Sequence, residues 1–146
     1  MEAPCKMHEI LACCGSRCDL CPRYQATING DKKRLAELAE LWHRCGWRDR
    51  VLPAEEMVCY GCVKTTWCRY DMPSCASGKG VANCGVCKQY SSCKRLEEMF
   101  SRNHLYAEKC KSVCSKEEYE MLRQTCFNKK KNLDKARRIS SKTRLR

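Results

Sequence analysis

The sequence has few of the side chains that build a large apolar core. Only two of its 146 residues are Phe, and Leu, Ile and Val are sparse for a chain of this length. Such a chain buries too little apolar surface to offset its conformational entropy by hydrophobic burial alone. The length fits one domain, or one domain with a tail. We therefore expect cross-links, either disulfides or bound metal, to stabilise the fold.

We also expect neither a secretion signal nor a membrane span. Residues 1–11 read MEAPCKMHEIL, which contains acidic residues and no apolar run, and no stretch approaches the roughly 18 apolar residues of a span. We expect a cytoplasmic protein. Sixteen residues are cysteine, and in a reducing cytosol thiols at this density are typical of metal ligands. The alternative is a secreted disulfide scaffold.

Motifs for catalysis are weak. The run SGKG at residues 77–80 lacks the earlier glycine and the following Ser or Thr of a phosphate loop, which favours a flexible turn. The adjacent Glu55 and Glu56 point apart, which favours solvated surface over an acid–base pair. No cysteine stands next to a histidine in the sequence. Whether the protein is an enzyme stays open, and a non-enzyme is favoured.

Positive charge is concentrated at the carboxyl end. The chain has a formal charge of +12, of which residues 128–146 contribute +8 through nine Lys or Arg and one acid. We divide the chain into a cysteine-rich metal-binding domain, 1–127, and a basic tail, 128–146, predicted to be disordered or a solvated helix. The tail either has no partner or contacts nucleic acid or an acidic protein. The contact residues would be Lys129, Lys130, Lys131, Lys135, Arg137 and Arg138.

Three segments have helical periodicity. Asp31 opens the first, and Gly46 ends it. The second runs from Ser92, and the third follows Ser115, where SKEE has the form of a capping box. Residues 59–93 are rich in Gly, Pro and Ser and are predicted to form metal-knuckle loops. The expected fold is a small, mostly α, cysteine-rich and metal-stabilised domain, with helices packed around irregular loops.

Three C-x2-C pairs predict metal knuckles. They are Cys18/Cys21, Cys59/Cys62 and Cys84/Cys87. Two intervening residues let the chain turn so that both sulfurs face one ion at about 2.3 Å. Gly61 and Gly85 lie inside two of the pairs, where a knuckle favours a residue that can adopt positive φ. The second and third pairs are separated by 21 residues, close to the spacing of a four-cysteine zinc site.

A further site needs a fourth ligand. Cys14 joins the first knuckle to give three thiols, and Cys75 and Cys93 are the first candidates for the fourth, before Cys13 and Cys68. Sequence alone does not pair them. The histidines lie outside every knuckle and are interpreted as surface or packing residues (His8, His43 and His104). The predicted metal ligands are Cys14, Cys18, Cys21, Cys59, Cys62, Cys75, Cys84, Cys87 and Cys93.

Zinc is the favoured cofactor, at about two ions, and an iron–sulfur cluster is the alternative. Cys14-x3-Cys18-x2-Cys21 is the spacing with which radical S-adenosylmethionine enzymes bind a four-iron cluster. Those enzymes need an α/β barrel of roughly 200 residues or more, which this chain lacks, but a bare cluster stays open. Knuckles with glycine and without histidine favour structural zinc. A metalloenzyme is the weakest alternative, because catalytic zinc usually recruits His or a carboxylate.

Three later cysteines stand apart from the knuckles. Cys110 and Cys114 lie one helical turn apart, and Cys126 follows on the third helix. Small buried apolar residues are slightly favoured over a third metal site for them. Trp42 and Trp47 flank the end of the first helix, and core packing is favoured over a ligand platform.

Two parts of the sequence resemble one known family. The first is Cys14-Gly15-x2-Cys18-x2-Cys21-Pro22-x-Tyr24-x-Ala26-Thr27. The second comprises Cys59-x-Gly61-Cys62, Cys75-Ala76 and Lys79-Gly80-Val81-x-Asn83-Cys84-x2-Cys87-x2-Tyr90-x2-Cys93-x2-Leu96. Both are similar to an uncharacterised prokaryotic family, domain of unknown function 3795. The resemblance covers roughly residues 10 to 100 and leaves 101–127 as a helical extension.

The chain departs from the family pattern at one position. The pattern places a cysteine five residues before Cys75, where this chain has Tyr70, and Cys68 lies two residues earlier. The ligand set around Cys68 and Cys75 therefore stays open. The resemblance implies a metal-binding module without an established activity. We expect a zinc-stabilised interaction module, with an iron–sulfur or thiol redox protein, or a metal carrier, as the alternative.

Overall fold

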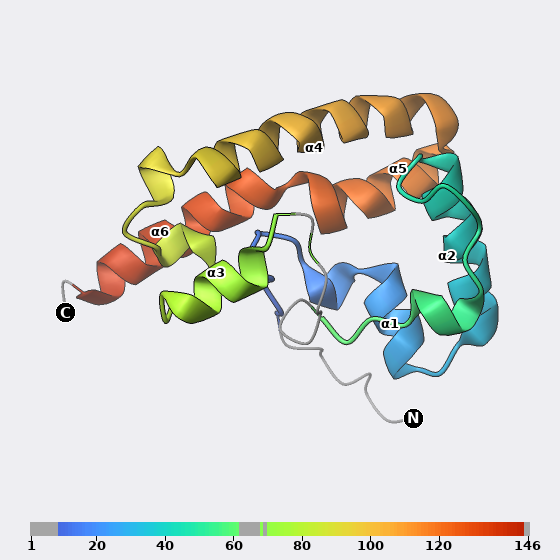
Figure 1. Cartoon of the computed structure of the whole chain (residues 1–146), viewed down its shortest axis with the longest axis horizontal. Coiled ribbons are helices and arrows are strands. Elements are labelled where there is room, and N and C mark those ends of the chain that lie inside the picture. Colours follow the sequence, from blue (N-terminus) through green and yellow to red (C-terminus); the bar gives the residue numbers. More distant parts are fainter. Residues whose placement is uncertain (1–8, 62–67, 69, 145–146) are drawn as a thin grey trace.

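The fold is helical, with α-helices of 7 to 20 residues joined by loops and short turns. The computed structural model describes residues 9–61, 68 and 70–144, so Cys62 lies outside them. The α-helices are α1 (Pro22–Ile28), α2 (Lys32–Arg44), α3 (Met72–Gly78), α4 (Lys94–Val113), α5 (Lys116–Leu122) and α6 (Lys129–Arg144) (Figure 1). The 3-10 turns are η1 (Cys18–Leu20), η2 (Ala54–Met57), η4 (Cys84–Val86) and η5 (Tyr90–Ser92), and η6 (Arg123–Phe127) is a π-helical turn.

The mostly helical prediction is confirmed, but the prediction of loops throughout residues 59–93 is wrong at Met72–Gly78, which forms α3. Within the residues described, the only β-type pairing is an isolated antiparallel bridge between Leu11 and Arg17. None of the helices in this part of the chain is long and apolar enough to cross a membrane.

The capping signals in the sequence mark the real helix boundaries. The side chain of Asp31 accepts a hydrogen bond of 3.0 Å from the N–H of Arg34 at the start of α2, and Gly46, with φ of +79°, follows its end. The capping box at α5 is complete. Ser115 Oγ accepts from the N–H of Glu118 at 3.1 Å, and Glu118 Oε1 accepts from the N–H of Ser115 at 2.9 Å.

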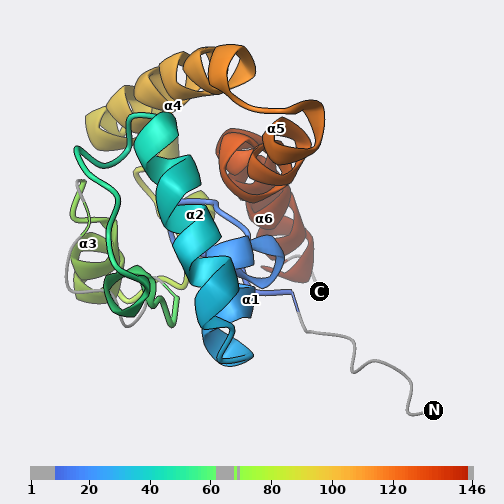
Figure 2. The same cartoon turned by 90° about the vertical axis from the view of Figure 1, so that its right-hand side faces the viewer.

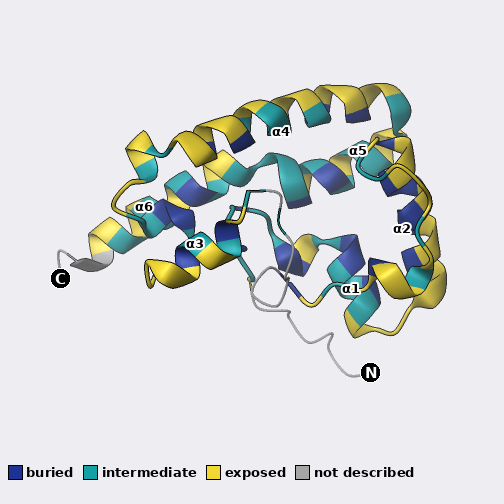
Figure 3. Ribbon diagram, in the orientation of Figure 1, coloured by how far each residue is buried: buried dark blue, intermediate teal, exposed yellow. Residues whose placement is uncertain are grey.

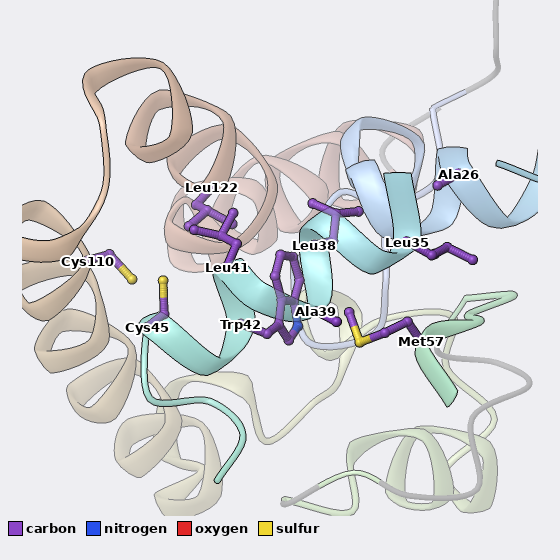
Figure 4. Close-up of a cluster of buried hydrophobic side chains, with 10 residues drawn as sticks. All are labelled: Ala26, Leu35, Leu38, Ala39, Leu41, Trp42, Cys45, Met57, Cys110 and Leu122. Atoms are coloured by element: carbon purple, nitrogen blue, oxygen red, sulfur yellow. The ribbon is translucent and has the colours of Figure 1, made fainter. Parts of the chain in front are cut away.

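The first apolar cluster surrounds α2. Figure 2 shows this helix crossing the middle of the molecule, with α3 on one side and α5 and α6 on the other. Leu35, Leu38 and Leu41 point into a cluster that also contains Trp42, Met57 from η2 and Leu122 from α5 (Figure 4). Trp42 is 6% exposed, so its predicted place in the core is confirmed.

A second apolar cluster lies between α3, the start of α4 and α6. Its buried members include Met72, Leu96, Met99 and Leu133, together with thiol-bearing residues of the loops. The outer side of α4 is mainly exposed (Figure 3). Two small clusters in place of one large core match the scarcity of apolar side chains in the sequence.

The tail was predicted to be disordered or a solvated helix, and the structure has a helix, α6, over residues 129–144. Leu133 is fully buried, although its neighbours in sequence are mostly charged. Asn132 Nδ2 donates to the carbonyl of Gly15 at 2.9 Å, and Arg137 Nη1 donates to the carbonyls of Gly85 and Cys87 at 3.2 Å each. Charge composition indicated solvation, but one apolar side chain and a few directed hydrogen bonds attach this helix to the loops.

Candidate metal centres

The tightest group of thiols in the described part of the chain consists of Cys45, Cys110 and Cys114, which we call the thiol trio. Their sulfur atoms all lie within 4.8 Å of one another, and the sulfurs of Cys45 and Cys114 are 3.5 Å apart. Figure 4 shows the side chains of Cys45 and Cys110 pointing toward each other. Tetrahedral zinc with bonds of about 2.3 Å separates its sulfur ligands by about 3.8 Å. The trio can therefore hold a metal ion.

The trio forms where two helices end. Cys45 is the C-terminal cap of α2, Cys110 lies in the last turn of α4, and Cys114 caps that helix. An ion pair of 2.9 Å between Arg44 and Glu118 joins the end of α2 to α5. Because the carboxyl end of each helix carries partial negative charge, two such ends favour a cation between them.

The pKa values of Cys45 and Cys114 are raised, which favours the protonated thiols when no metal is bound. Cys45 and Cys110 are 1% and 0% exposed, and Cys114 is half-buried. The hydrogen bond with Cys110, and then burial, raise the pKa of Cys45 well above its usual value. Burial, and then the hydrogen bond with Cys45, raise the pKa of Cys114 to about 12. A metal ion would have to displace these protons, so binding would release them to solvent.

The trio is the part of the site that sequence analysis missed. It slightly favoured packing for Cys110 and Cys114, and it did not include Cys45 among the predicted ligands. The spacing of Cys110 and Cys114 on one helix was a usable signal. Cys45 joins them only through tertiary packing. Cys126 lies elsewhere: burial raises its pKa to about 12, with nearby Cys21, Cys14 and Cys18 adding to the rise while Lys129 opposes it.

The first knuckle turns as the sequence predicts. In η1 the N–H of Cys21 donates to the carbonyl of Cys18 at 3.1 Å. Thr27 Oγ1 on α1 accepts from the N–H of Cys59 at 3.0 Å, which holds the second knuckle beside the first. Burial raises the pKa of Cys21 to about 11; backbone hydrogen bonds from Tyr24 and Arg23 oppose the rise, and nearby Cys59 and Cys18 add smaller contributions to it. The structure thus brings Cys18, Cys21 and Cys59 together; Cys62 is outside the residues described.

The third knuckle has the same turn, with the N–H of Cys87 donating to the carbonyl of Cys84 at 3.2 Å. Burial raises the pKa of Cys84 to about 11, with smaller contributions from four nearby thiols: Cys14, Cys75, Cys87 and Cys93. The carbonyl of Cys13 accepts a hydrogen bond from the N–H of Cys84 at 2.9 Å. Both residues belong to the second apolar cluster, and Cys68 packs against that cluster. These cysteines are neighbours, and their division into ligand sets stays a prediction.

The two knuckle glycines have different roles. Gly61 has φ of +97°, as the sequence predicts for a knuckle. The same prediction is wrong for Gly85, whose φ is not positive. At Gly85 a Cβ atom would collide with the carbonyl oxygen of Leu133, so glycine is needed there for the close approach of α6. The carbonyl oxygen of Lys129, one turn earlier on α6, occupies the equivalent space beside Gly15.

The basic residues predicted to contact a partner fall into two groups. Three make internal contacts: Lys129 with Asn103, Lys130 with Asp134, and Arg137 with carbonyls of the third knuckle. The other three are exposed, and with Lys142 they recur at helical spacing along α6. This basic stripe consists of Lys131, Lys135, Arg138 and Lys142. His43 and His104 are exposed, in line with the prediction of surface residues.

Comparison with known proteins places the cysteines in a family context. The model of the family described as "Protein of unknown function (DUF3795)" matches residues 10–98. No curated protein and no solved structure matches the chain. The matched segment contains every predicted ligand and Cys45, and it ends within α4 before Cys110. The thiol trio therefore joins the family segment to the helical extension.

Proposed function

The chain belongs to the family of unknown function DUF3795, and we propose that it is a small metal-binding protein in which zinc, held by thiolates, ties the helices and loops together. The observation that supports this proposal most strongly is the thiol trio, with three sulfurs within 4.8 Å where α2 and α4 end. A chain with two small apolar clusters gains much of its folding free energy from such a centre.

The geometry of the trio favours a single ion over an iron–sulfur cluster. A four-iron cluster binds its cysteines at separate corners and needs sulfurs farther apart than the 3.5 Å between Cys45 and Cys114. Zinc accepts three thiolates with a water or another donor in the fourth position. We propose that the knuckle regions hold the two ions predicted from the sequence and that the trio holds a third.

The test compares metal content among single variants of the trio. Cys45→Ser and Cys110→Ser should each lose about one equivalent of zinc relative to the purified wild-type protein, because serine is a poor ligand for structural zinc. Ala107→Ser is the matched control: it places the same hydroxyl group on the same buried side of α4, about one turn before Cys110, and should retain its zinc.

Three results would contradict the proposal. Equal zinc content in both cysteine variants and the control would exclude the trio as a metal site. Iron and labile sulfide in the purified wild-type protein would identify the bound group as an iron–sulfur cluster and exclude zinc. An unchanged circular dichroism spectrum after complete removal of metal by a chelator would exclude a role of the metal in holding the fold.

We also propose a second role for α6, in which the basic stripe contacts nucleic-acid phosphates. Its four members are exposed and share one helix face. Residues 128–146 contain no aromatic side chain on which a base could stack, so contact with the phosphate backbone is expected rather than recognition of sequence.

A further inference from the structure

A cavity of about 340 Å³ lies where the loop after α2 meets η6 and the start of α6. Its walls are largely aromatic and include Trp42, Trp47, Tyr70, Tyr106 and Phe127. The ring of Trp47 packs edge-on against Trp42, with centroids 5.0 Å apart, and against Phe127, with centroids 6.2 Å apart. The walls are therefore held by ring packing, and the volume falls in the range of small-molecule sites.

Two hydrogen-bond donors in this wall have no partner among the residues that the structure describes. Trp47 Nε1 and Tyr70 Oη are both buried, and neither forms a hydrogen bond with this part of the chain. Nearly all buried polar groups in folded proteins are paired, because an unpaired one loses its bonds to water without replacement. Two unpaired donors lining one cavity indicate that an acceptor belongs there.

Three cationic side chains also line this cavity. Arg23, Arg48 and Lys129 are part of the lining, and no carboxylate is among its described residues. Burial lowers the pKa of Arg48, and the positive charge of nearby Arg23 lowers it further. Lys129 Nζ donates to the neutral oxygen of Asn103 at 3.2 Å. A negative charge inside the cavity would reduce the repulsion among these cations.

We propose that this cavity binds a small organic anion: an aromatic ring that carries a carboxylate or a phosphate group. The ring packs among the aromatic walls, and the anionic oxygens accept hydrogen bonds from Trp47 Nε1 and Tyr70 Oη. The neighbouring cations provide the charge that favours an anion over a neutral molecule. None of the three thiols of the trio lines this cavity, and the proposal does not depend on a bound metal.

Binding is tested with four probes on the full-length protein as purified. They are 1-naphthoate, phenyl phosphate, inorganic phosphate and the neutral 1-naphthamide. Affinity is measured by calorimetry, and the indole N–H resonance of Trp47 is followed by NMR. At least one aromatic anion should bind about tenfold more tightly than the amide and than inorganic phosphate, and should shift that resonance. The tighter of the two aromatic anions identifies the preferred acidic group.

Two conservative variants test the donors. Trp47→Phe keeps an aromatic ring but removes the N–H, and Tyr70→Phe removes only the hydroxyl. Each should weaken the best anionic probe about tenfold, the effect of one hydrogen bond to a charged group. Tyr60→Phe is the control, because Tyr60 is 57% exposed and lies outside the lining of the cavity. This variant should bind the best anionic probe with the same affinity as the wild-type protein.

The proposal is overturned if no anionic probe binds at millimolar concentration, or if the amide binds as tightly as the anions. It is equally overturned if affinity is unchanged in both donor variants. If Trp47→Phe does not fold, Tyr70→Phe alone decides, since loss of one hydroxyl leaves the ring packing intact.

Discussion

Two glycines allow the backbone of α6 to lie directly on the cysteine loops. Gly15 has φ of +97° and faces the carbonyl of Lys129, while Gly85 faces the carbonyl of Leu133. These carbonyls are one helical turn apart, so successive turns of α6 rest on the two loops. A side chain at either glycine would push the helix away from both knuckle regions.

The substitution Gly85→Ala isolates this close approach, because φ at Gly85 is not positive and only the added methyl group matters. We expect a loss of about 1–3 kcal/mol in the free energy of unfolding, the usual cost of overpacking. Urea titration of the metal-loaded protein measures it.

Gly78→Ala is the control for that measurement. Nothing lies within 4 Å of a Cβ atom at Gly78, which ends α3. Its free energy of unfolding should be unchanged or rise by up to about 1 kcal/mol, since alanine is the better helix former. Equal losses of unfolding free energy in the two variants would show that the loss in Gly85→Ala does not come from a collision with the carbonyl of Leu133.

Among the elements, α6 depends on one apolar side chain. Leu133 is fully buried and is the residue that α6 contributes to the second cluster. Leu133→Ala should lower the free energy of unfolding by about 2–5 kcal/mol, because it removes buried apolar atoms and leaves a cavity. Ile139→Ala, on the same helix at a position that is 55% exposed, should change it by less than about 0.5 kcal/mol.

A small effect of Leu133→Ala, comparable to that of Ile139→Ala, would mean that α6 is not fixed to the loops in solution. Proteolysis adds an independent measurement. Leu133→Ala should be cleaved within residues 129–144 at protease concentrations that leave Ile139→Ala intact, because the helix opens more often.

Element prediction succeeded where the information was local. The Asp31 cap and the Ser115 capping box need only neighbouring residues, and both are present as expected. The first half of α6 is a basic run with a single leucine, whose burial depends on glycines far away in the sequence. No local pattern distinguishes Leu133 from an exposed leucine, so composition could not predict that this helix packs against the loops.

Across the whole molecule, local sequence likewise predicts some of the cysteine groups, whereas others depend on tertiary packing. The turns at Cys18/Cys21 and Cys84/Cys87 follow from their spacing, and the structure contains both. The thiol trio requires that the ends of α2 and α4 meet, which depends on how the apolar faces of several helices pack. Spacing within a sequence identifies ligands that share a turn, and it cannot identify ligands that share only a tertiary contact.

The basic stripe of α6 gives the last prediction, which concerns the charge of the whole molecule. A variant with Lys131→Gln, Lys135→Gln and Arg138→Gln removes three exposed charges and leaves Leu133 and the internal contacts of α6 in place. If these residues contact phosphates, duplex DNA binding should weaken, and the slope of log K against log salt should become shallower by about 0.9 for each phosphate that is no longer neutralised.

The matched control removes three exposed lysines elsewhere, with Lys32→Gln, Lys33→Gln and Lys116→Gln. Its net charge equals that of the stripe variant, so any difference between the two reports the location of the charges and not their number. Weaker binding in the stripe variant alone supports the proposed contact. Equal weakening in both would mean that DNA responds only to net charge, and stronger binding of polyglutamate than of DNA to the wild-type protein would assign the stripe to an acidic protein partner.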